Sequence, residues 1–128
     1  MKISKAPKPS KGSLKVYEYP KCSTCVKALK FLDASGVDYE KIDITLQPPS
    51  LAEFKTMLSH GVELRKLFNT SGLVYKEMKL SEKLPELSEA EALKLLSGNG
   101  RLVKRPFLLG PDFGLVGFRE EEWSAKIS

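Results

Sequence analysis

Residues 14–44 read LKVYEYPKCSTCVKALKFLDASGVDYEKIDI, and this stretch decides the fold class. Residues 14–19 alternate in a period of two and contain several β-formers, which predicts a strand that ends at Pro20. From Ser23 the apolar residues recur at helical spacing, and Ser35-Gly36 supplies a stop, so a helix follows. Residues 39–44 alternate again after a link that permits only a parallel return. The stretch therefore predicts a right-handed βαβ unit and an α/β fold.

The remainder of the chain predicts a helical block, a hairpin and a last helix. Helical spacing and capping signals predict helices over residues 50–60, 63–68, about 74–80 and 88–96. Residues 106–109 and 114–118 predict two strands joined by a tight turn, and residues 119–127 predict a helix with Trp123 on its inner face. We therefore expect a thioredoxin-like α/β fold. Its mixed four-stranded sheet carries a helical insertion, about residues 50–98, between the βαβ and ββα halves.

The composition is that of a soluble globular domain whose body carries little net charge. Of 128 residues, 41% are hydrophobic, 29% are charged, and the formal charge is +5. Five basic residues lie between Lys2 and Lys15, so the body is close to neutral and lacks the clustered basic face that nucleic-acid binding needs. No apolar run approaches the roughly 20 residues that span a bilayer, and no secretory h-region follows the N-terminus. We therefore expect a cytoplasmic protein that binds neither nucleic acid nor membranes.

Residues 1–12 differ in composition from the rest. Pro7, Pro9 and Gly12 interrupt a Lys-rich stretch with almost nothing to bury, which predicts a disordered leader. We expect residues 13–128 to form a single domain.

The chain contains two cysteines, Cys22 and Cys25. They are too few for a disulfide scaffold or for a four-thiolate zinc site, and no metal site is predicted. A C-x-x-C motif that follows a strand and opens a helix within a βαβ unit instead indicates a redox pair. The alternatives are two incidental cysteines on one helix surface, or half of an intermolecular metal site.

The position of Cys22 favours its thiolate. A free cysteine has a pKa near ~8.5, and the unpaired N–H groups and dipole at a helix N-terminus lower it. Lys21 and the hydroxyls of Ser23 and Thr24 can add to this effect. Cys25 lies one helical turn later on nearly the same face, where it can attack a mixed disulfide formed on Cys22. We therefore expect Cys22 to attack and Cys25 to resolve.

The likeness to a known family runs from about Leu14 to the C-terminus. Four segments closely resemble the ArsC-like family: CSTCVKA (22–28), RKLFNTSG (65–72), KRPFL (104–108) and LVGF (115–118). That family includes glutaredoxin-dependent arsenate reductases, YffB-type proteins thought to be glutathione-dependent thiol reductases, and Spx-type regulators that bind RNA polymerase. The resemblance implies a thioredoxin-like fold with a helical insertion and identifies Cys22 with the family nucleophile.

The resemblance also implies an opposite wall for the site. It places Pro106 at the cis-proline loop that faces the active-site cysteine, where proline offers no competing N–H. Arg105 would then face Cys22, stabilise its thiolate and bind an oxyanion or a glutathione carboxylate. The alternative is that Arg105 is a surface arginine within the basic run 101–105.

Two further positions bear on the substrate. Arg65 matches an arginine that arsenate reductases use to hold the oxyanion. The alternative is that Arg65 is a solvated residue on its helix without a role in the site. Gly117 stands where arsenate reductases have their third anion-binding arginine, as in YffB-type and Spx-type sequences. The missing guanidinium removes a contact worth about 1.5–3 kcal/mol, which argues against efficient arsenate reduction.

The expected function is thiol-disulfide oxidoreduction of the arsenate reductase-like kind. Glutathione, or a glutaredoxin or thioredoxin, would be co-substrate or partner, and no bound cofactor is expected. The main alternative is an Spx-type regulator whose Cys22–Cys25 pair controls attachment to RNA polymerase. True arsenate reduction is the third reading.

Overall fold

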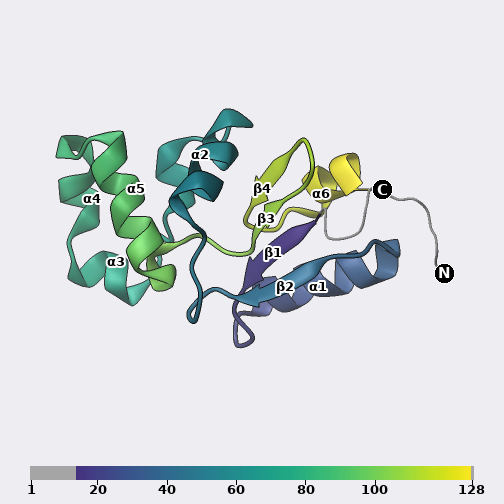
Figure 1. The fold of residues 1–128 in the computed structure, drawn as a ribbon. Helices are drawn as coiled ribbons and strands as arrows, with labels where there is room; N and C mark the ends of the chain where they lie inside the picture. Colours follow the sequence, from purple (N-terminus) through teal and green to yellow (C-terminus); the bar gives the residue numbers. More distant parts are fainter. Residues whose placement is uncertain (1–13, 128) are drawn as a thin grey trace.

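The βαβ unit forms at the predicted place in the chain. The computed structural model describes residues 14–127 (Figure 1), so the predicted leader lies outside the described residues. The unit comprises β1 (Lys15–Glu18), α1 (Ser23–Ser35) and β2 (Glu40–Asp43). β1 and β2 pair in parallel. Gly36 ends α1 in the left-handed conformation with φ of 73°, which glycine adopts without strain.

The second half of the sheet is a hairpin. β3 (Phe107–Leu109) and β4 (Gly114–Val116) pair antiparallel, and β3 also pairs antiparallel with β1. The strand order is β2-β1-β3-β4, so the sheet is mixed and four-stranded. α6 (Glu120–Ile127) follows the hairpin. The predicted α/β fold class is confirmed.

A block of helices lies between β2 and β3 in the sequence, and its later helices lie to one end of the sheet in Figure 1. Its members are α2 (Leu51–Ser59), η1 (Leu64–Leu67), α3 (Leu73–Glu77), α4 (Leu80–Lys83), η2 (Leu84–Glu86), α5 (Glu89–Gly98) and η3 (Gly100–Leu102). The single helix expected over about 74–80 is wrong, because α3 ends at Glu77 and Lys79 takes a left-handed φ of 55° before α4 begins. The helix expected over 63–68 is a shorter 3₁₀ turn, η1.

A capping box at Ser50 fixes the start of α2, at the place where the capping signals predict a helix. The Glu53 N–H donates to Ser50 Oγ at 3.1 Å, and Glu53 Oε1 accepts from the Ser50 N–H at 2.9 Å. The same carboxylate accepts from the Tyr17 hydroxyl at 2.6 Å and from Lys15 Nζ at 2.8 Å. Glu53 therefore ties the first turn of α2 to β1.

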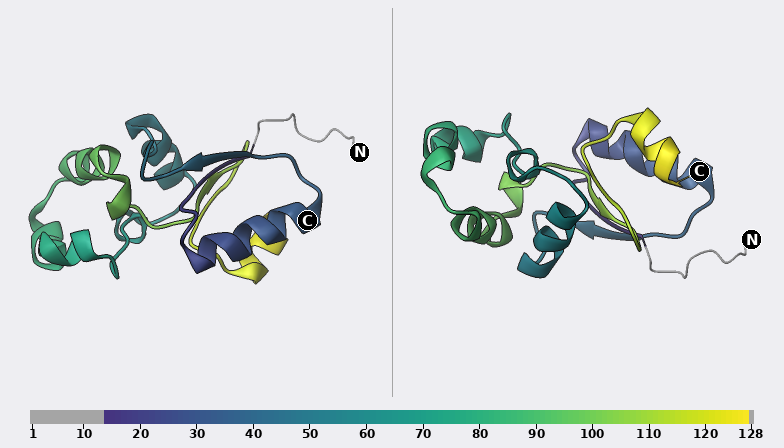
Figure 2. Two further views of the ribbon diagram at one scale, coloured as in Figure 1. Left: turned by 90° about the horizontal axis from the view of Figure 1, so that it is seen from below. Right: turned by 90° about the horizontal axis from the view of Figure 1, so that it is seen from above.

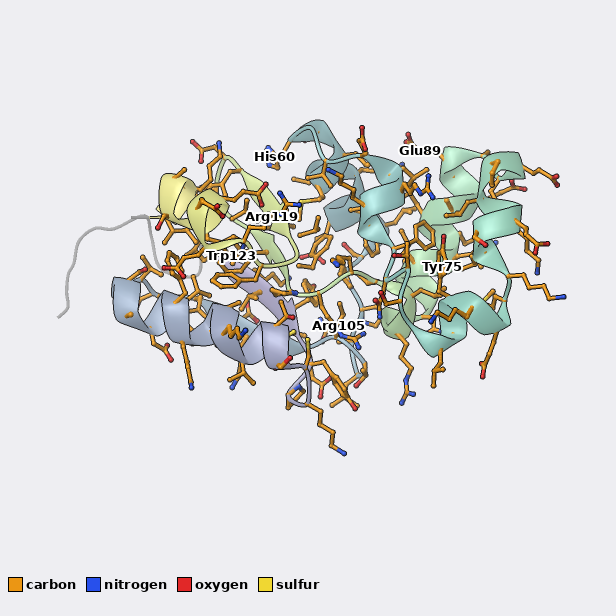
Figure 3. The ribbon with its side chains drawn as sticks, turned by 180° about the vertical axis from the view of Figure 1, so that it is seen from behind. His60, Tyr75, Glu89, Arg105, Arg119 and Trp123 are labelled. Carbon is orange, nitrogen blue, oxygen red and sulfur yellow. The ribbon has the colours of Figure 1, made fainter. Side chains whose placement is uncertain are left out.

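The core lies on both faces of the sheet. α1 and α6 cover one face and α2 covers the other (Figure 2). On the first face the fully buried Trp123 indole lies between α1 and α6 (Figure 3), which confirms the predicted inner face of the last helix. On the other face Phe107 packs edge-on against Tyr17 and Phe54, with ring centroids 5.8 and 5.3 Å apart. Burying each such side chain stabilises the fold by about 1.5–3 kcal/mol.

No helix within residues 14–127 is long and apolar enough to cross a membrane.

Candidate functional site

Cys22 occupies the N-cap of α1, where the chain leaves β1 and turns into the helix. Its backbone is extended, and its Sγ accepts a hydrogen bond from the Cys25 N–H at 3.4 Å. This N–H is one of the first-turn donors that have no partner inside the helix. The thiol sulfur therefore takes the role that a serine or aspartate oxygen has at other N-caps, which favours its negative charge.

The two cysteines differ in exposure. Both are free thiols; Cys22 is half-buried and Cys25 is fully buried. An approaching molecule meets Cys22 first, while Cys25 stays covered one helical turn behind it. The structure thus brings together the two predicted redox residues and gives them different access to solvent.

The surroundings lower the pKa of Cys22 from that of an ordinary thiol. Partial burial acts against this, because it favours the neutral thiol. The thiolate is favoured by hydrogen bonds from the thiol and the N–H of Cys25. A hydrogen bond from Arg105 and its positive charge add to this, and together these effects outweigh burial. Burial and the neighbouring Cys22 raise the pKa of Cys25. Cys22 is therefore the thiol of the pair that ionises first.

Glu18 is a buried carboxyl near the cysteines that the sequence pattern does not single out. It lies at the end of β1 with only 4% of its surface exposed. Burial raises the pKa of Glu18, the Lys41 ammonium lowers it and the Asp43 carboxylate raises it. The negative charge of Glu18 in turn raises the pKa of Cys25, which helps to keep that thiol protonated.

Arg105 and Pro106 form the loop before β3, and the peptide bond between them is cis. The Arg105 guanidinium carbon lies 5.2 Å from the centre of the Tyr19 ring, a cation–π distance. Its Nη1 is buried and has no hydrogen-bond acceptor among the residues that the structure describes. A buried donor left unpaired costs about 1–3 kcal/mol, so an anionic ligand at this nitrogen would remove that cost.

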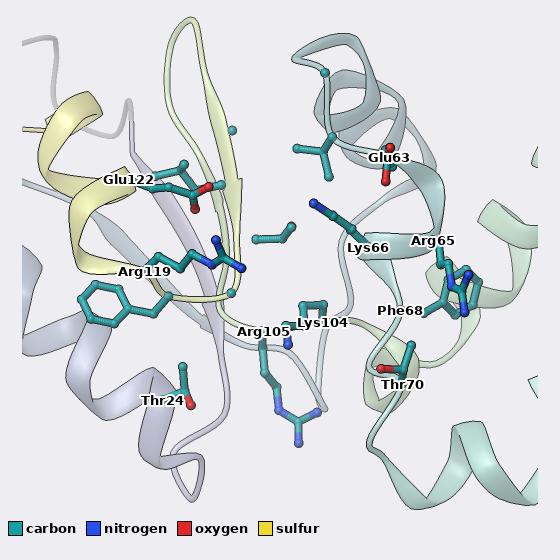
Figure 4. Close-up of a pocket in the computed structure, with 17 residues that line it drawn as sticks. Thr24, Glu63, Arg65, Lys66, Phe68, Thr70, Lys104, Arg105, Arg119 and Glu122 are labelled. Carbon is teal, nitrogen blue, oxygen red and sulfur yellow. The ribbon is translucent and has the colours of Figure 1, made fainter. Parts of the chain in front are cut away.

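A cavity of about 830 Å³ opens beside this loop (Figure 4). Thr24 and Arg105 lie on one side of it, and Arg65, Phe68 and Thr70 lie on the other. Its cationic lining residues are Arg65, Lys66, Lys104, Arg105 and Arg119, and its carboxylates are Glu63 and Glu122. The cavity therefore carries an excess of positive charge and is suited to an anion.

The predicted site residues do not all line this cavity. Arg105, Thr24 and Arg65 do, whereas Cys22, Cys25, Ser23 and Pro106 do not. Arg105 joins the two parts of the site, because it lines the cavity and also interacts with Cys22. Ser23 is exposed on the first turn of α1, and Pro106 is buried.

Sequence reasoning did not assign Lys66, Lys104 and Arg119 to the site. Lys104 belongs to the basic run that precedes Pro106, and Arg119 stands two residues after the glycine in the family motif LVGF. Within residues 14–127, no group of three or more His, Cys, Asp and Glu side chains is placed to hold a metal ion.

The conformation of Gly117 explains why no side chain stands at that position. Its φ is 73°, and a Cβ there would lie 3.1 Å from Lys104 Cε. Its N–H donates to the Pro106 carbonyl at 2.9 Å, and its carbonyl accepts from Trp123 Nε1 at 3.0 Å. Gly117 therefore joins the Pro106 loop to α6 and leaves room for Lys104.

The chain is similar to proteins of known sequence and structure. The family model described as "ArsC family" matches residues 17–126. The uncharacterized protein YusI of Bacillus subtilis is 46% identical over 112 residues, covering 87% of this chain and 95% of that protein. A global transcriptional regulator Spx of Streptococcus pyogenes is 30% identical, covering 85% of this chain and 81% of that protein. The crystal structure of an ArsC family related protein from Bacteroides fragilis is 45% identical, with a TM-score of 0.85 and coverage of 88% and 96%. This chain is a member of the ArsC family.

Proposed function

We propose that the protein is a thiol-disulfide oxidoreductase in which Cys22 attacks and Cys25 resolves. The observation that carries the proposal is the Cys22 sulfur at the N-cap of α1, 3.4 Å from the Cys25 N–H and next to the Arg105 guanidinium. These donors lower the pKa of Cys22, and the thiolate is the form that attacks a disulfide. The solvent-accessible thiol is thus also the more acidic one.

The first step is attack by the Cys22 thiolate on one sulfur of a disulfide. A bond forms between Cys22 Sγ and that sulfur, the substrate S–S bond breaks, and the second sulfur leaves as a thiolate that takes up a proton. Arg105 stabilises the thiolate before the attack. Thr24 and Arg65 line the cavity into which the substrate reaches. In this proposal Ser23 and Pro106, which the sequence predicts for the site, also contact the substrate.

The second step is resolution by Cys25. Its thiol gives up its proton and attacks Cys22 Sγ, the mixed disulfide breaks, and the remaining half of the substrate leaves as a thiolate. The protein ends with a Cys22–Cys25 disulfide, and the substrate disulfide has gained two electrons. Glutathione, or the dithiol of a glutaredoxin or thioredoxin, returns two electrons to the protein in this proposal.

Arsenate is the less favoured substrate. Gly117 carries no guanidinium, and its positive φ would strain an arginine placed there. Losing one charge-assisted contact to a doubly charged oxyanion costs about 1.5–3 kcal/mol. We expect arsenate-dependent turnover to equal the background rate.

The proposal is tested by mixing the reduced protein with a glutathionylated peptide and following the products by mass spectrometry. The unmodified chain should release peptide thiol and glutathione and end with an internal disulfide. Cys25→Ser should stop at a mixed disulfide on Cys22, and Cys22→Ser should not react. Equal rates for Cys22→Ser and the unmodified chain would contradict the assignment.

A second candidate function is redox-controlled regulation of transcription. The similarity to Spx, 30% identity over 112 residues, favours it. In this reading the Cys22–Cys25 disulfide changes the affinity for RNA polymerase. Pull-down of RNA polymerase by the reduced and the oxidised protein tests it, and the regulator reading fails if neither form retains the polymerase.

A further inference from the structure

We infer that Lys66, Lys104 and Arg119 form a second anion subsite, separate from Arg105, that binds a carboxylate of a small anionic disulfide. The inference rests on the proposed function, because that disulfide is the molecule whose sulfur Cys22 attacks. None of the three residues belongs to the set that the sequence predicts for the site.

The three cations reach the cavity from three different segments. Lys66 belongs to η1, Lys104 to the loop before β3, and Arg119 directly precedes α6. Figure 4 shows Lys66 and Arg119 extending toward each other from opposite sides of the cavity, with Lys104 between the two walls. Arg105 points away from this group, toward the Tyr19 side. The guanidinium of Arg105 and the side chains of Lys66 and Arg119 therefore point to different parts of the cavity.

Backbone hydrogen bonds fix the three segments to one another. The Lys104 N–H donates to the Leu67 carbonyl at 2.8 Å, which joins the loop before β3 to the residue after Lys66. The Gly117 N–H donates to the Pro106 carbonyl at 2.9 Å, and the Trp123 N–H donates to the Arg119 carbonyl at 3.0 Å. The backbones that carry the three cations are therefore held in place before any ligand arrives, although the side chains themselves are exposed.

Among residues 14–127, the charges in this group have no partner at ion-pair distance. Within the described part of the chain, the one ion pair shorter than 4 Å joins Lys15 and Glu53, on another part of the surface. Glu63 and Glu122 line the same cavity, yet neither lies within that distance of Lys66, Lys104 or Arg119. An anion between the two walls would relieve the repulsion among these cations and gain charge-assisted hydrogen bonds.

The size and charge of the cavity favour a small carboxylate. Its volume of about 830 Å³ falls in the range of roughly 300–1,000 Å³ that is usual for small-molecule sites. Glu63 and Glu122 reduce the excess positive charge, which favours a singly charged carboxylate over a doubly charged phosphate. A disulfide whose carboxylate binds here presents its sulfur on the Thr24 and Arg105 side, next to Cys22.

The test compares three small symmetrical disulfides that differ in charge, each in a separate reaction. Reduced protein is mixed with 3,3′-dithiodipropionate, which is anionic, 2-hydroxyethyl disulfide, which is neutral, and cystamine, which is cationic. Each reaction consumes one disulfide per protein dithiol and needs no further reductant. We expect the anionic disulfide to react fastest. Arg119→Gln should lower that rate at least about fivefold, while the rate with the neutral disulfide changes less than about twofold.

Arg101→Gln is the matched control, because Arg101 is exposed, does not line the cavity, and carries the same charge. It should leave all three rates unchanged. Arg119→Glu should reverse the order and favour cystamine. If Arg119→Gln and Arg101→Gln lower the rate with the anionic disulfide equally, the subsite is overturned, since long-range charge would then explain both effects.

A binding measurement separates failure of the subsite from failure of the proposed function. Cys22→Ser protein is titrated with 3,3′-dithiodipropionate, and the NMR shifts of the Gly117 and Phe118 amides are followed. Adding Arg119→Gln should weaken binding at least about fivefold. If no disulfide reacts with the unmodified chain but this difference is found, the proposed function fails and the subsite stands. If the neutral disulfide reacts and no binding is found, the subsite fails alone.

Discussion

At the scale of single residues, the reactivity of Cys22 depends on a few donors around one sulfur. The helix N-terminus supplies the Cys25 N–H, and the loop before β3 supplies Arg105. The first donor is local in the sequence, so the C-x-x-C motif predicts it. The second lies about eighty residues away and was predicted only through the family resemblance. Arg105 is thus the residue whose removal tests the long-range part of the site.

Arg105→Gln should raise the pKa of Cys22 toward that of an ordinary thiol, because it removes a hydrogen bond and a positive charge from the thiolate. The rate of alkylation by iodoacetamide follows the thiolate fraction, so its pH profile gives the pKa. We expect the midpoint for the unmodified chain to lie below the ordinary value of about 8.5, and the midpoint for Arg105→Gln to lie above that of the unmodified chain. Mass spectrometry assigns the label to Cys22. An unchanged midpoint would show that Arg105 does not act on this thiol.

Gly117→Ala should destabilise the protein by about 1–2 kcal/mol, because the φ of 73° places an added Cβ in the left-handed region and close to Lys104. Gly98→Ala is the control, since a Cβ there meets nothing within 4 Å and its φ is not positive. It lies in α5 and should leave the stability unchanged or raise it slightly. Urea unfolding measures both. Equal stability of the two variants would contradict the proposed need for glycine at position 117.

At the scale of elements, capping signals predicted helix starts better than periodicity predicted helix ends. Helices begin at the predicted Ser50 and Ser88, and each serine forms a capping box, because the partners lie three residues apart and need no tertiary contact. The break at Lys79 was missed, because a left-handed conformation at a lysine has no sequence signal of the kind that glycine gives. The helix starts are therefore locally encoded, whereas this interruption has no local signal in the sequence.

Glu53→Gln should destabilise the protein by about 1 kcal/mol near neutral pH, because the carboxylate accepts from Lys15, Tyr17 and the Ser50 N–H. Burial raises the pKa of Glu53, but these contacts outweigh it and lower the pKa. A lowered pKa means that the stabilisation is full above the unfolded value of about 4.3 and is lost as the pH falls through the folded value. Urea unfolding between pH 7 and pH 3 should therefore show the two proteins converging at acid pH.

Glu91→Gln is the control for this experiment. Glu91 forms the same box with Ser88, and no further side-chain hydrogen bond to it is found within residues 14–127. Its replacement should cost less than that of Glu53 near neutral pH. A larger cost for Glu91 would show that the contacts of Glu53 with β1 add nothing to the stability.

At the scale of the whole molecule, the sequence predicted the sheet and the cysteine pair but not the charged cavity. Period-two alternation and the C-x-x-C spacing are local patterns. They therefore predicted β1, α1 and the placement of Cys22 and Cys25 at the start of that helix. Lys66, Lys104 and Arg119 are spread over more than fifty residues and meet only because the helical block and the hairpin pack beside each other. Their shared cavity depends on tertiary structure, which no single motif encodes.

The prediction that residues 13–128 form a single domain can be tested through Phe107. This side chain is fully buried and packs against Tyr17 and Phe54. It belongs to β3, and the next residue of that strand, Leu108, packs in the cluster on the other face of the sheet. Phe107→Ala should cost about 3–5 kcal/mol, through lost burial and the cavity left behind. Leu46→Ala is the control, since Leu46 is 83% exposed, and it should cost almost nothing.

The readout for Phe107→Ala uses two probes in different parts of the molecule. Trp123 is the one tryptophan of the sequence and reports the α1–α6 face, whereas far-ultraviolet circular dichroism is weighted toward the helical block. If the two halves unfold cooperatively, both urea transitions coincide in the unmodified chain and move together in the variant. A circular dichroism transition that shifts while the Trp123 transition stays in place would show that the helical block unfolds separately. The insertion would then be a unit of its own, and the charged cavity would lie between two independently folding parts.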